Sequence, residues 1–337
     1  MFNARSVVAV ALALMGLVAA APPSRGDDFY KGKTVIIQVG FSAGGGYDVN
    51  ARAVARHLGK HIPGNPNVLV QNVPGAGSLT SVRSLDATVA KDGTVMTVFN
   101  PGLITQSVVE PDKVKLDFRK FSWVGVITPD FRVCYGFGPD GVKSWDDMMK
   151  RKEFILGSTA KGAGNYINGA TLKHVFDAPV RQILGFPGSA EQRIAIERGE
   201  LDGDCGSYSS IPIAWIKENK AHPFVRFTEK RPPEIPESAV YINTFAKTDE
   251  QKQLLNVLNA ADEVGRPFIM SQQVPADRLA ILRKAFSETM KDQAFLSDME
   301  KQQLPVHPLS GEEAQALVAK LANVPPAIAA KAKQIYE

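Results

Sequence analysis

Ser42 lies in the segment GFSAG (40–44), which matches the G-x-S-x-G motif of serine hydrolases. In those enzymes the serine follows a strand, precedes a helix and becomes a nucleophile when a histidine removes its proton. Here the strand before Ser42 is expected to be the first of the fold, so no earlier loop supplies a second oxyanion donor. The sequence has no HGGG-type motif, and its five histidines include no obvious partner for Ser42. A hydrolase that uses Ser42 is therefore kept as the alternative hypothesis.

Five glycine-rich loops are a stronger signal, because each follows a predicted strand. They are GFSAGGG (40–46), NVPGAGS (72–78), GSTAKGAGN (157–165), GFPGS (185–189) and GDCGS (203–207). Glycine lets the backbone approach a ligand closely and leaves N–H groups available as donors. Helices are expected to begin after at least four of these loops, and helix N-termini favour anions. The pattern predicts a site that holds a small anion by backbone amides, without an arginine or lysine at its centre.

Strands and helices alternate along the chain, which predicts an α/β fold with mostly parallel sheets flanked by helices. Strands are expected at 34–39, 67–71, 94–99, 132–137, 153–157, 180–184 and 202–205, and helices at 48–60, 79–90, 165–176, 189–199, 211–219, 249–263, 275–290 and 311–321. Ser189 with Gln192 and Ser310 with Glu313 have the spacing of a capping box. Ligands of such sheets bind beyond the carboxyl ends of the strands, where the glycine-rich loops lie.

Length and composition limit the possible functions. The 337 residues are enough for two domains, and 44% hydrophobic with 22% charged residues is typical of a soluble globular protein. A net charge of +4 is too small to indicate a nucleic-acid partner. Two cysteines exclude a disulfide scaffold and a cysteine zinc cluster, and Cys134 and Cys205 form either one bridge or a buried free pair. We expect no metal ion and no cofactor.

Residues 1–26 have the form of a secretory signal peptide. Arg5 is the positive region, VVAVALALMGLV (7–18) is the apolar region, and Ala19 to Ala21 offer small residues for cleavage. An uncleaved membrane anchor is the alternative, which the short apolar region disfavours. The mature protein is therefore expected in the periplasm, an oxidising compartment.

Several segments, taken in order, resemble the substrate-binding proteins of tripartite tricarboxylate transporters, also called the Bug family. FSAGGGYDVNARAVARHL (41–58) resembles their first binding loop and helix, and VLVQNVPGAGS (68–78) their Val-x-Asn-x-Pro-Gly-Ala-Gly segment. KDGTVMTVF (91–99) is similar to their Asp-Gly-Tyr-Thr-Leu strand. GSTAKGAGNYINGATLKHVF (157–176) and GFPGSAEQRIAIERGELDGDC (185–205) resemble their second-domain loops.

The resemblance implies a two-lobed type II periplasmic binding protein, with a mostly parallel sheet and flanking helices in each lobe. Lobe one is expected at 27–128 plus 229–337, and lobe two at 129–228. Members bind a small organic acid in the cleft, close on a hinge and deliver the ligand to integral-membrane permease subunits. We therefore predict a monomeric periplasmic solute-binding protein for a small organic carboxylate, not an enzyme. An exported serine hydrolase is the alternative.

The loops and the resemblance together nominate the ligand-binding residues. They are Ser42, Gly45, Gly46, Tyr47, Asp48, Asn72, Ala76, Gly77, Phe99, Asn100, Ser158, Thr159, Gly162, Asn165, Phe186, Gly188 and Asp204. Asp48 suits either a helix-capping role or a hydrogen bond to the ligand, directly or through water. Asp204 suits a strand-end cap better than a ligand contact.

Three departures from the family pattern bear on the ligand. Tyr47 stands where a threonine or serine is common, and Asn100, preceded by Phe99, stands where a serine or glycine is common. The C-terminus ends in an atypical NVPPAIAAKAKQIYE. If Tyr47, Phe99 and Phe186 all reach the cleft mouth, they favour a ligand with an apolar or aromatic body over a compact tricarboxylate.

Overall fold

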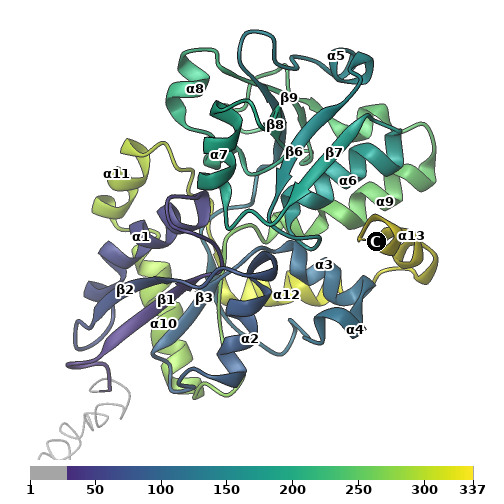
Figure 1. Cartoon of the computed structure of the whole chain (residues 1–337). Helices are drawn as coiled ribbons and strands as arrows, with labels where there is room; N and C mark the ends of the chain where they lie inside the picture. The colour runs from purple at the N-terminus through teal and green to yellow at the C-terminus, as the bar shows by residue number, and fades with distance from the viewer. Residues whose placement is uncertain (1–28, 337) are drawn as a thin grey trace, which may run out of the picture.

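A computed structural model describes residues 29–336 of the protein. The signal peptide expected at residues 1–26 lies outside the described residues. Two six-stranded sheets, each flanked by helices, form an upper and a lower lobe (Figure 1). The expected two-lobed α/β class is thus confirmed.

Sheet one lies in lobe one, the lower lobe of Figure 1, and has the strand order β12-β4-β11-β3-β1-β2. Its strands are β1 (Thr34–Val39), β2 (Asn67–Asn72), β3 (Val95–Val98), β4 (Ser122–Val126), β11 (Pro267–Met270) and β12 (Leu309–Ser310). β1 is parallel to β2 and β3, whereas β11 is antiparallel to β3 and β4. The sheet is therefore mixed, and its parallel part is the first three strands of the chain.

Sheet two lies in lobe two and has the order β10-β9-β5-β8-β6-β7. Its strands are β5 (Val133–Phe137), β6 (Phe154–Ser158), β7 (Val180–Leu184), β8 (Gly203–Asp204), β9 (Ala221–Arg226) and β10 (Val240–Tyr241). β6 is parallel to β7 and β8, whereas β5 is antiparallel to both of its neighbours. β10 pairs with β9, so sheet two extends past residue 228, where we expected the chain to return to lobe one. The residue limits of the lobes stay a prediction.

Helices cover both sheets. They are α1 (Gly46–Leu58), α2 (Leu79–Ala87), α3 (Gly102–Val109), α4 (Pro111–Val114), α5 (Trp145–Lys150), α6 (Gly164–Phe176), α7 (Ser189–Glu197), α8 (Ile213–Lys217), α9 (Asp249–Asn259), α10 (Ala276–Thr289), α11 (Gln293–Lys301), α12 (Gly311–Leu321) and α13 (Pro326–Tyr336). α1 forms because Ala51, Val54 and Leu58 make an apolar stripe that packs into the core of lobe one. Among residues 29–336, no helix combines the length and the apolar character needed to cross a membrane.

The two capping boxes expected from the sequence have different outcomes. Ser310 and Glu313 form one at the start of α12. Ser189 and Gln192 do not, because Gly188 is the N-cap of α7 and Ser189 is already helical. That second prediction was wrong by one residue.

The chain crosses between the lobes twice, at 127–132 and at 260–266. The Asp130 N–H donates to the Asp262 carbonyl at 2.8 Å, so the two crossings are tied to each other. We call these two segments the hinge. Four charged side chains of the hinge are buried: Asp130, Arg132, Asp262 and Arg266.

α13 joins the lobes along one side of the molecule. It packs against α3 of lobe one and against α6 and α9 beside lobe two (Figure 1). Ile328 and Ile335 enter one apolar cluster with Val109 of α3 and Ile167 of α6. The cleft is therefore expected to open on the other side, where α1 and α11 approach α7 and α8.

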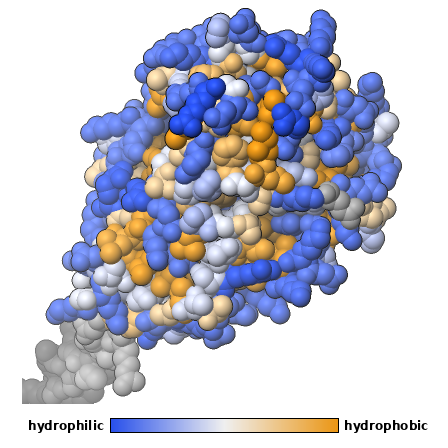
Figure 2. Space-filling model, viewed as in Figure 1, coloured by the Kyte–Doolittle hydropathy of each residue, from blue (hydrophilic) through white to orange (hydrophobic). Residues whose placement is uncertain are grey.

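The edge strands leave some apolar side chains exposed. Leu69 on β2 is 58% exposed, and Leu184 on β7 is also exposed. Figure 2 shows hydrophobic residues over the lower left of the molecule, where Figure 1 draws β2 and α1. Hydrophilic residues cover most of the remaining rim in this view.

A disulfide joins Cys134 on β5 to Cys205 after β8, inside the core of lobe two. The sequence left open whether this pair is bridged or free. The bond links residues 71 positions apart in the chain. Such bonds form and persist in oxidising compartments.

Candidate ligand-binding site

A small polar cavity lies between the lobes, where the loops after β1, β3 and β6 meet. Its volume is about 50 Å³. The lining consists of Phe41, Gly45, Gly46, Tyr47, Asn100, Arg132, Thr159, Ala163, Gly164, Asn165, Ser189, Gln192, Asp204, Gly206, Ser207 and Ser210. Both lobes contribute, and the position is the one expected for ligands at the carboxyl ends of parallel strands.

Three helices begin at this cavity. Gly46 starts α1, Gly164 starts α6 and Ser189 starts α7, and all three residues line the cavity. Each N-terminus carries N–H groups without helical partners and a partial positive charge, so together they favour an anion. Gly164 has no room for a side chain, because a Cβ there would overlap the Arg132 guanidinium.

Arg132 is the buried cation in the cavity wall, with 4% of its surface exposed. Its Nε donates to Asp262 Oδ1 at 2.8 Å, and its Nη2 lies 2.7 Å from Asp130 Oδ2. Burial disfavours the charge on Arg132, but the two carboxylates raise its pKa above the ordinary value. The sequence did not point to Arg132, which the hinge brings to the cavity wall; that backbone amides hold the anion without needing an arginine stays a prediction.

Asp130 is held between two guanidinium groups. It pairs with Arg132, and its Oδ1 lies 3.7 Å from Arg266 Nη2 and accepts a hydrogen bond from the Ser207 hydroxyl. Tyr47 donates to Asp130 Oδ2 at 3.3 Å, and Arg266 lies over the Tyr47 ring, 4.6 Å from its centroid. Burial would raise the pKa of Asp130, but the guanidiniums and hydrogen bonds hold it below its ordinary value. Asp130 therefore connects Tyr47 of lobe one, Ser207 of lobe two and the two hinge arginines.

Two other buried carboxyl groups have raised pKa values. Asp204 lines the cavity and is 5% exposed, and burial raises its pKa to about 6. Burial also raises the pKa of Asp262 to about 7; the Arg132 charge opposes this shift and the Asp130 charge adds to it. Both groups can take up a proton near neutral pH, so the charge around the cavity depends on pH.

The structure brings part of the nominated set to this cavity. The nominated residues that line it are Gly45, Gly46, Tyr47, Asn100, Thr159, Asn165 and Asp204. The others are not in its lining: Ser42, Asp48, Asn72, Ala76, Gly77, Phe99, Ser158, Gly162, Phe186 and Gly188. Contact of any of these residues with a ligand stays a prediction.

Asp48 and Asn72 support the first loop instead of facing the cavity. Asp48 Oδ2 accepts hydrogen bonds from the Gly44 N–H at 2.8 Å and from Arg52 Nε at 2.9 Å, and Asn72 Nδ2 donates to Asp48 Oδ1 at 2.9 Å. Burial would raise the pKa of Asp48, but these hydrogen bonds hold it below its ordinary value. Both carboxylate oxygens are thus used within lobe one.

Phe99 lies in the core of lobe one, so its expected place at the cleft mouth was wrong. It is fully buried, with its ring centroid 5.1 Å from that of Phe118. Phe99 and Asn100 both follow the end of β3 at Val98, and Asn100 lines the cavity. Tyr47 does reach the cavity, where its ring stacks on Phe41 at 4.9 Å. Phe186 is half-buried against an apolar cluster of lobe two.

Hydrogen bonds across the cleft show that the structure is a closed form. Ser42 Oγ in lobe one donates to Glu191 Oε2 in lobe two at 2.7 Å. Asn100 Nδ2 donates to the Gly162 carbonyl at 2.8 Å. Gly188 has no room for a side chain beside Ser42. Several nominated loop residues therefore make contact between the lobes.

Ser42 lacks the surroundings of a catalytic nucleophile. Its hydroxyl donates to Glu191, and the hydrogen-bonded histidine side chains within residues 29–336 have other partners, such as Asp298 for His57. The serine of a nucleophile elbow sits on a strained turn, whereas Ser42 is not among the described residues with a positive φ. These observations favour a binding protein over a hydrolase.

Sequence reasoning missed Arg132, Ser189, Gln192 and Ser207. A signal for Arg132 was present, because Asp130 and Arg132 stand in the otherwise apolar stretch that leads into β5. Charged residues are almost never fully buried unless they are paired. The pairing itself depends on residues 260–266, which are far away in the sequence.

Two lobes, a two-segment hinge and a polar cavity at helix N-termini define the fold of a periplasmic binding protein. The structure of the periplasmic binding protein BugD is similar, with a TM-score of 0.75 and 19% identity, covering 91% of this chain and 98% of that chain. The structure of MatC from Rhodopseudomonas palustris with bound malate has a TM-score of 0.70 and 17% identity, and the match covers 90% of this chain and 99% of that chain. The structure of an R. palustris protein with adipate has a TM-score of 0.70 and 17% identity, and the match covers 90% of this chain and 97% of that chain. At these identities the likeness shows the fold.

Sequence comparison points to the same group of proteins. A UPF0065 protein in the TAR-I ttuE-ttuC' intergenic region of Agrobacterium vitis is 24% identical over 219 residues. The match covers 64% of this chain and 62% of the relative, so the chain spans less than two thirds of that relative's length. No family model matches the chain. The resemblance to the Bug family that the loop motifs indicated is confirmed by these relatives.

Proposed function

We propose that this protein captures a small organic carboxylate in the periplasm and delivers it to the integral-membrane permease subunits of a tripartite tricarboxylate-type transporter. The observation that carries the proposal is the polar cavity, where three helix N-termini and Arg132 meet between the lobes. Backbone N–H groups and a guanidinium are suitable donors for a carboxylate. The likeness to proteins solved with malate and adipate supports the same class of ligand.

The mechanism is cleft closure. The carboxylate binds the loop amides of one lobe in the open form, and the other lobe then completes its hydrogen bonds and excludes water. A ligand favours closure only through contacts that it makes in the closed form. The cross-cleft bonds of Ser42 and Asn100 add to that preference. The protein acts as a monomer and performs no reaction on its ligand.

Two features support a periplasmic location. Residues 1–26 have the form of a signal peptide. The buried Cys134–Cys205 disulfide suits an oxidising compartment.

A thermal-shift screen of organic acids on the mature protein tests this function. An acid present at about 100 times its Kd should stabilise the protein by about 2.7 kcal/mol. Small-angle X-ray scattering at saturation should then show a smaller radius of gyration. If no acid stabilises the protein and a fluorophosphonate probe labels Ser42, the hydrolase hypothesis replaces this one.

A further inference from the structure

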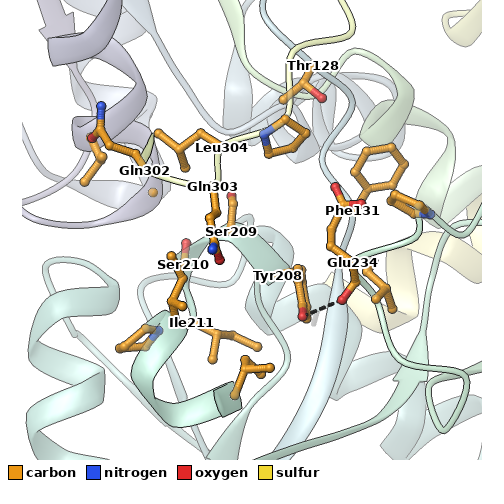
Figure 3. Close-up of a pocket in the computed structure, with 18 of the residues that line it drawn as sticks. Thr128, Phe131, Tyr208, Ser209, Ser210, Ile211, Glu234, Gln302, Gln303 and Leu304 are labelled. Carbon is orange, nitrogen blue, oxygen red and sulfur yellow. Dashed lines mark hydrogen bonds between the residues drawn. The ribbon is translucent and has the colours of Figure 1, made fainter. Parts of the chain in front are cut away.

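A second and much larger cavity, of about 570 Å³, lies beside the polar cavity in the same cleft (Figure 3). Figure 3 shows Leu304 and Gln303 from lobe one facing Ser209 and Ile211 from lobe two, with Phe131 beside them. This cavity is lined in part by residues of α8 and by the residues that follow α11, and Figure 1 draws both helices on the side away from α13. We call it the apolar cavity.

Hydrocarbon side chains dominate the lining of the apolar cavity. They include Phe131, Ile211, Ile213, Ile216, Ile235 and Leu304. Its volume falls in the usual range for ligand pockets, about 300–1,000 Å³. A dry apolar cavity of about 150 Å³ already accommodates benzene, so this one has room for a chain or a ring.

The two cavities are adjacent and share two lining residues. Gly46 and Ser210 line both of them. A Cβ at Gly46 would lie 2.5 Å from Ser210 Oγ, so the two residues meet across the cleft. Gly46 belongs to lobe one and Ser210 to lobe two. The boundary between the cavities therefore lies at the contact between the two lobes, beside Arg266, which donates to Ser207 and Ser209.

The polar cavity cannot hold a whole ligand in the closed form. Its volume is about 50 Å³, and on the same measure a cavity needs about 10–15 Å³ to hold one water, so it takes about three to five water-sized groups. That space suits one carboxylate group and little more. The rest of any larger acid needs room elsewhere, and the apolar cavity is the adjoining space of sufficient size.

We propose that the apolar cavity takes the hydrocarbon body of a ligand whose carboxylate occupies the polar cavity. The substrate class is then a monocarboxylate with an apolar chain or ring, rather than a compact polyacid. This inference rests on the proposed function and narrows it. Arg193 in the lining already donates to the Gly44 and Ser210 carbonyls, and the other charged lining residues, Lys217 and Glu234, are exposed. A second carboxylate held among Ile211, Ile235 and Leu304 would therefore lose hydration. A hydrocarbon body instead gains from burial.

Isothermal titration calorimetry with three acids and three proteins tests the proposal. The acids are propanoate, octanoate and suberate, the last having the length of octanoate and a second carboxylate. The proteins are the wild type, Ile213→Trp, which fills the apolar cavity from α8, and Ala214→Trp. Ala214 is the next residue of the same helix, is exposed and does not line the cavity.

Each buried methylene is expected to tighten binding about fourfold. Octanoate should therefore bind the wild type at least a hundredfold more tightly than propanoate, and at least tenfold more tightly than suberate. Ile213→Trp should weaken octanoate binding at least tenfold and leave propanoate binding unchanged. Ala214→Trp should change neither. Apolar burial should also make the heat-capacity change for octanoate more negative in the wild type than in Ile213→Trp.

Three results would overturn the proposal, and they are distinguishable. If propanoate binds as tightly as octanoate, or if Ile213→Trp weakens both acids equally, the lobes make room for ligands without the apolar cavity. The proposed function then stands and this inference falls. If none of the three acids, nor malate or adipate, binds the wild type, the proposed function and the inference fall together.

Discussion

Arg193 in lobe two donates from Nη2 to the Gly44 carbonyl in lobe one at 2.8 Å, while its Nη1 donates to the Ser210 carbonyl in its own lobe at 3.0 Å. One guanidinium therefore fastens the loop before α1 to the loop before α8 across the cleft. The bond to Gly44 forms only when the lobes are closed. It lies on the side opposite α13, where closure has to be completed.

Replacing Arg193 by glutamine should weaken ligand binding by shifting the protein towards its open form. A hydrogen bond that involves a charged group contributes about 1.5–3 kcal/mol, which corresponds to a rise in Kd of about ten- to 150-fold. Calorimetry with the acid that the screen identifies measures the change. Arg198→Gln is the matched control, because Arg198 is 69% exposed at the other end of the same helix. Equal affinities for Arg193→Gln and the wild type would show that this bond has no part in closure.

Arg132→Lys should weaken carboxylate binding at least tenfold, although the positive charge is kept. A lysine lacks the planar set of donors that serves Asp130 and Asp262 together, so it cannot hold the same position in the cavity wall. Arg198→Lys is the control, since Arg198 is not in the cavity lining and its side chain is 69% exposed. Circular dichroism at the assay temperature verifies that each variant is folded. Wild-type affinity in Arg132→Lys would leave the helix N-termini as the sole carboxylate donors.

Removing the disulfide should lower the stability of lobe two. In the chain-entropy model, a bond that spans 71 residues contributes roughly 4 kcal/mol to the free energy of unfolding. Cys134→Ala with Cys205→Ala should therefore lower Tm in differential scanning calorimetry. A reducing agent should bring the wild type towards the same Tm and leave the double variant unchanged. A wild-type Tm that is the same before and after complete reduction would contradict this expectation.

Local patterns were sufficient to predict much of the fold. β-branched runs followed by glycine-rich loops correctly predicted β1, β2, β6 and β7. The spacing of Ser310 and Glu313 correctly predicted the start of α12. β11 was missed, because four residues, Pro267–Met270, stand in a region that otherwise reads as helical. That strand forms by antiparallel pairing with β3 and β4, which are far away in the sequence. α13 was missed because its apolar partners lie on α3, α6 and α9.

The candidate site was predictable only where it is made of local loops. Glycine and the helix that follows it are neighbours in the chain, so the loop residues Gly45 and Gly46 could be nominated. Arg132 gains its role from Asp262, across 130 residues of sequence. Phe99 was misplaced because composition does not show that β3 ends at Val98. It therefore does not show whether Phe99 or Asn100 faces the cleft.

Asp204 should make both stability and ligand affinity depend on pH. Burial raises its pKa from 3.8 to about 6. Between these values the folded protein binds more protons than the unfolded chain, so the contribution of Asp204 to the free energy of unfolding falls as pH rises from about 4 to 6. Above pH 7 the buried charge lowers that free energy by at most about 3 kcal/mol. The same charge in the cavity wall repels a carboxylate ligand.

Asp204→Asn should therefore be more stable than the wild type at pH 8, and the two should converge at pH 4. The amide oxygen of the asparagine can still accept the hydrogen bond from the Cys205 N–H, so the local geometry is kept. The affinity of the wild type for the ligand should fall as pH rises from 5 to 8, and that of Asp204→Asn should fall less. Part of the pH dependence remains in the variant because burial also raises the pKa of Asp262, to about 7.

Urea unfolding and calorimetry at pH 4, 6 and 8 measure the stability and the ligand affinity, with Asp140→Asn as an exposed control. If Asp204→Asn is less stable than the wild type at pH 8, the carboxylate at this position is ionised and satisfied in the folded protein.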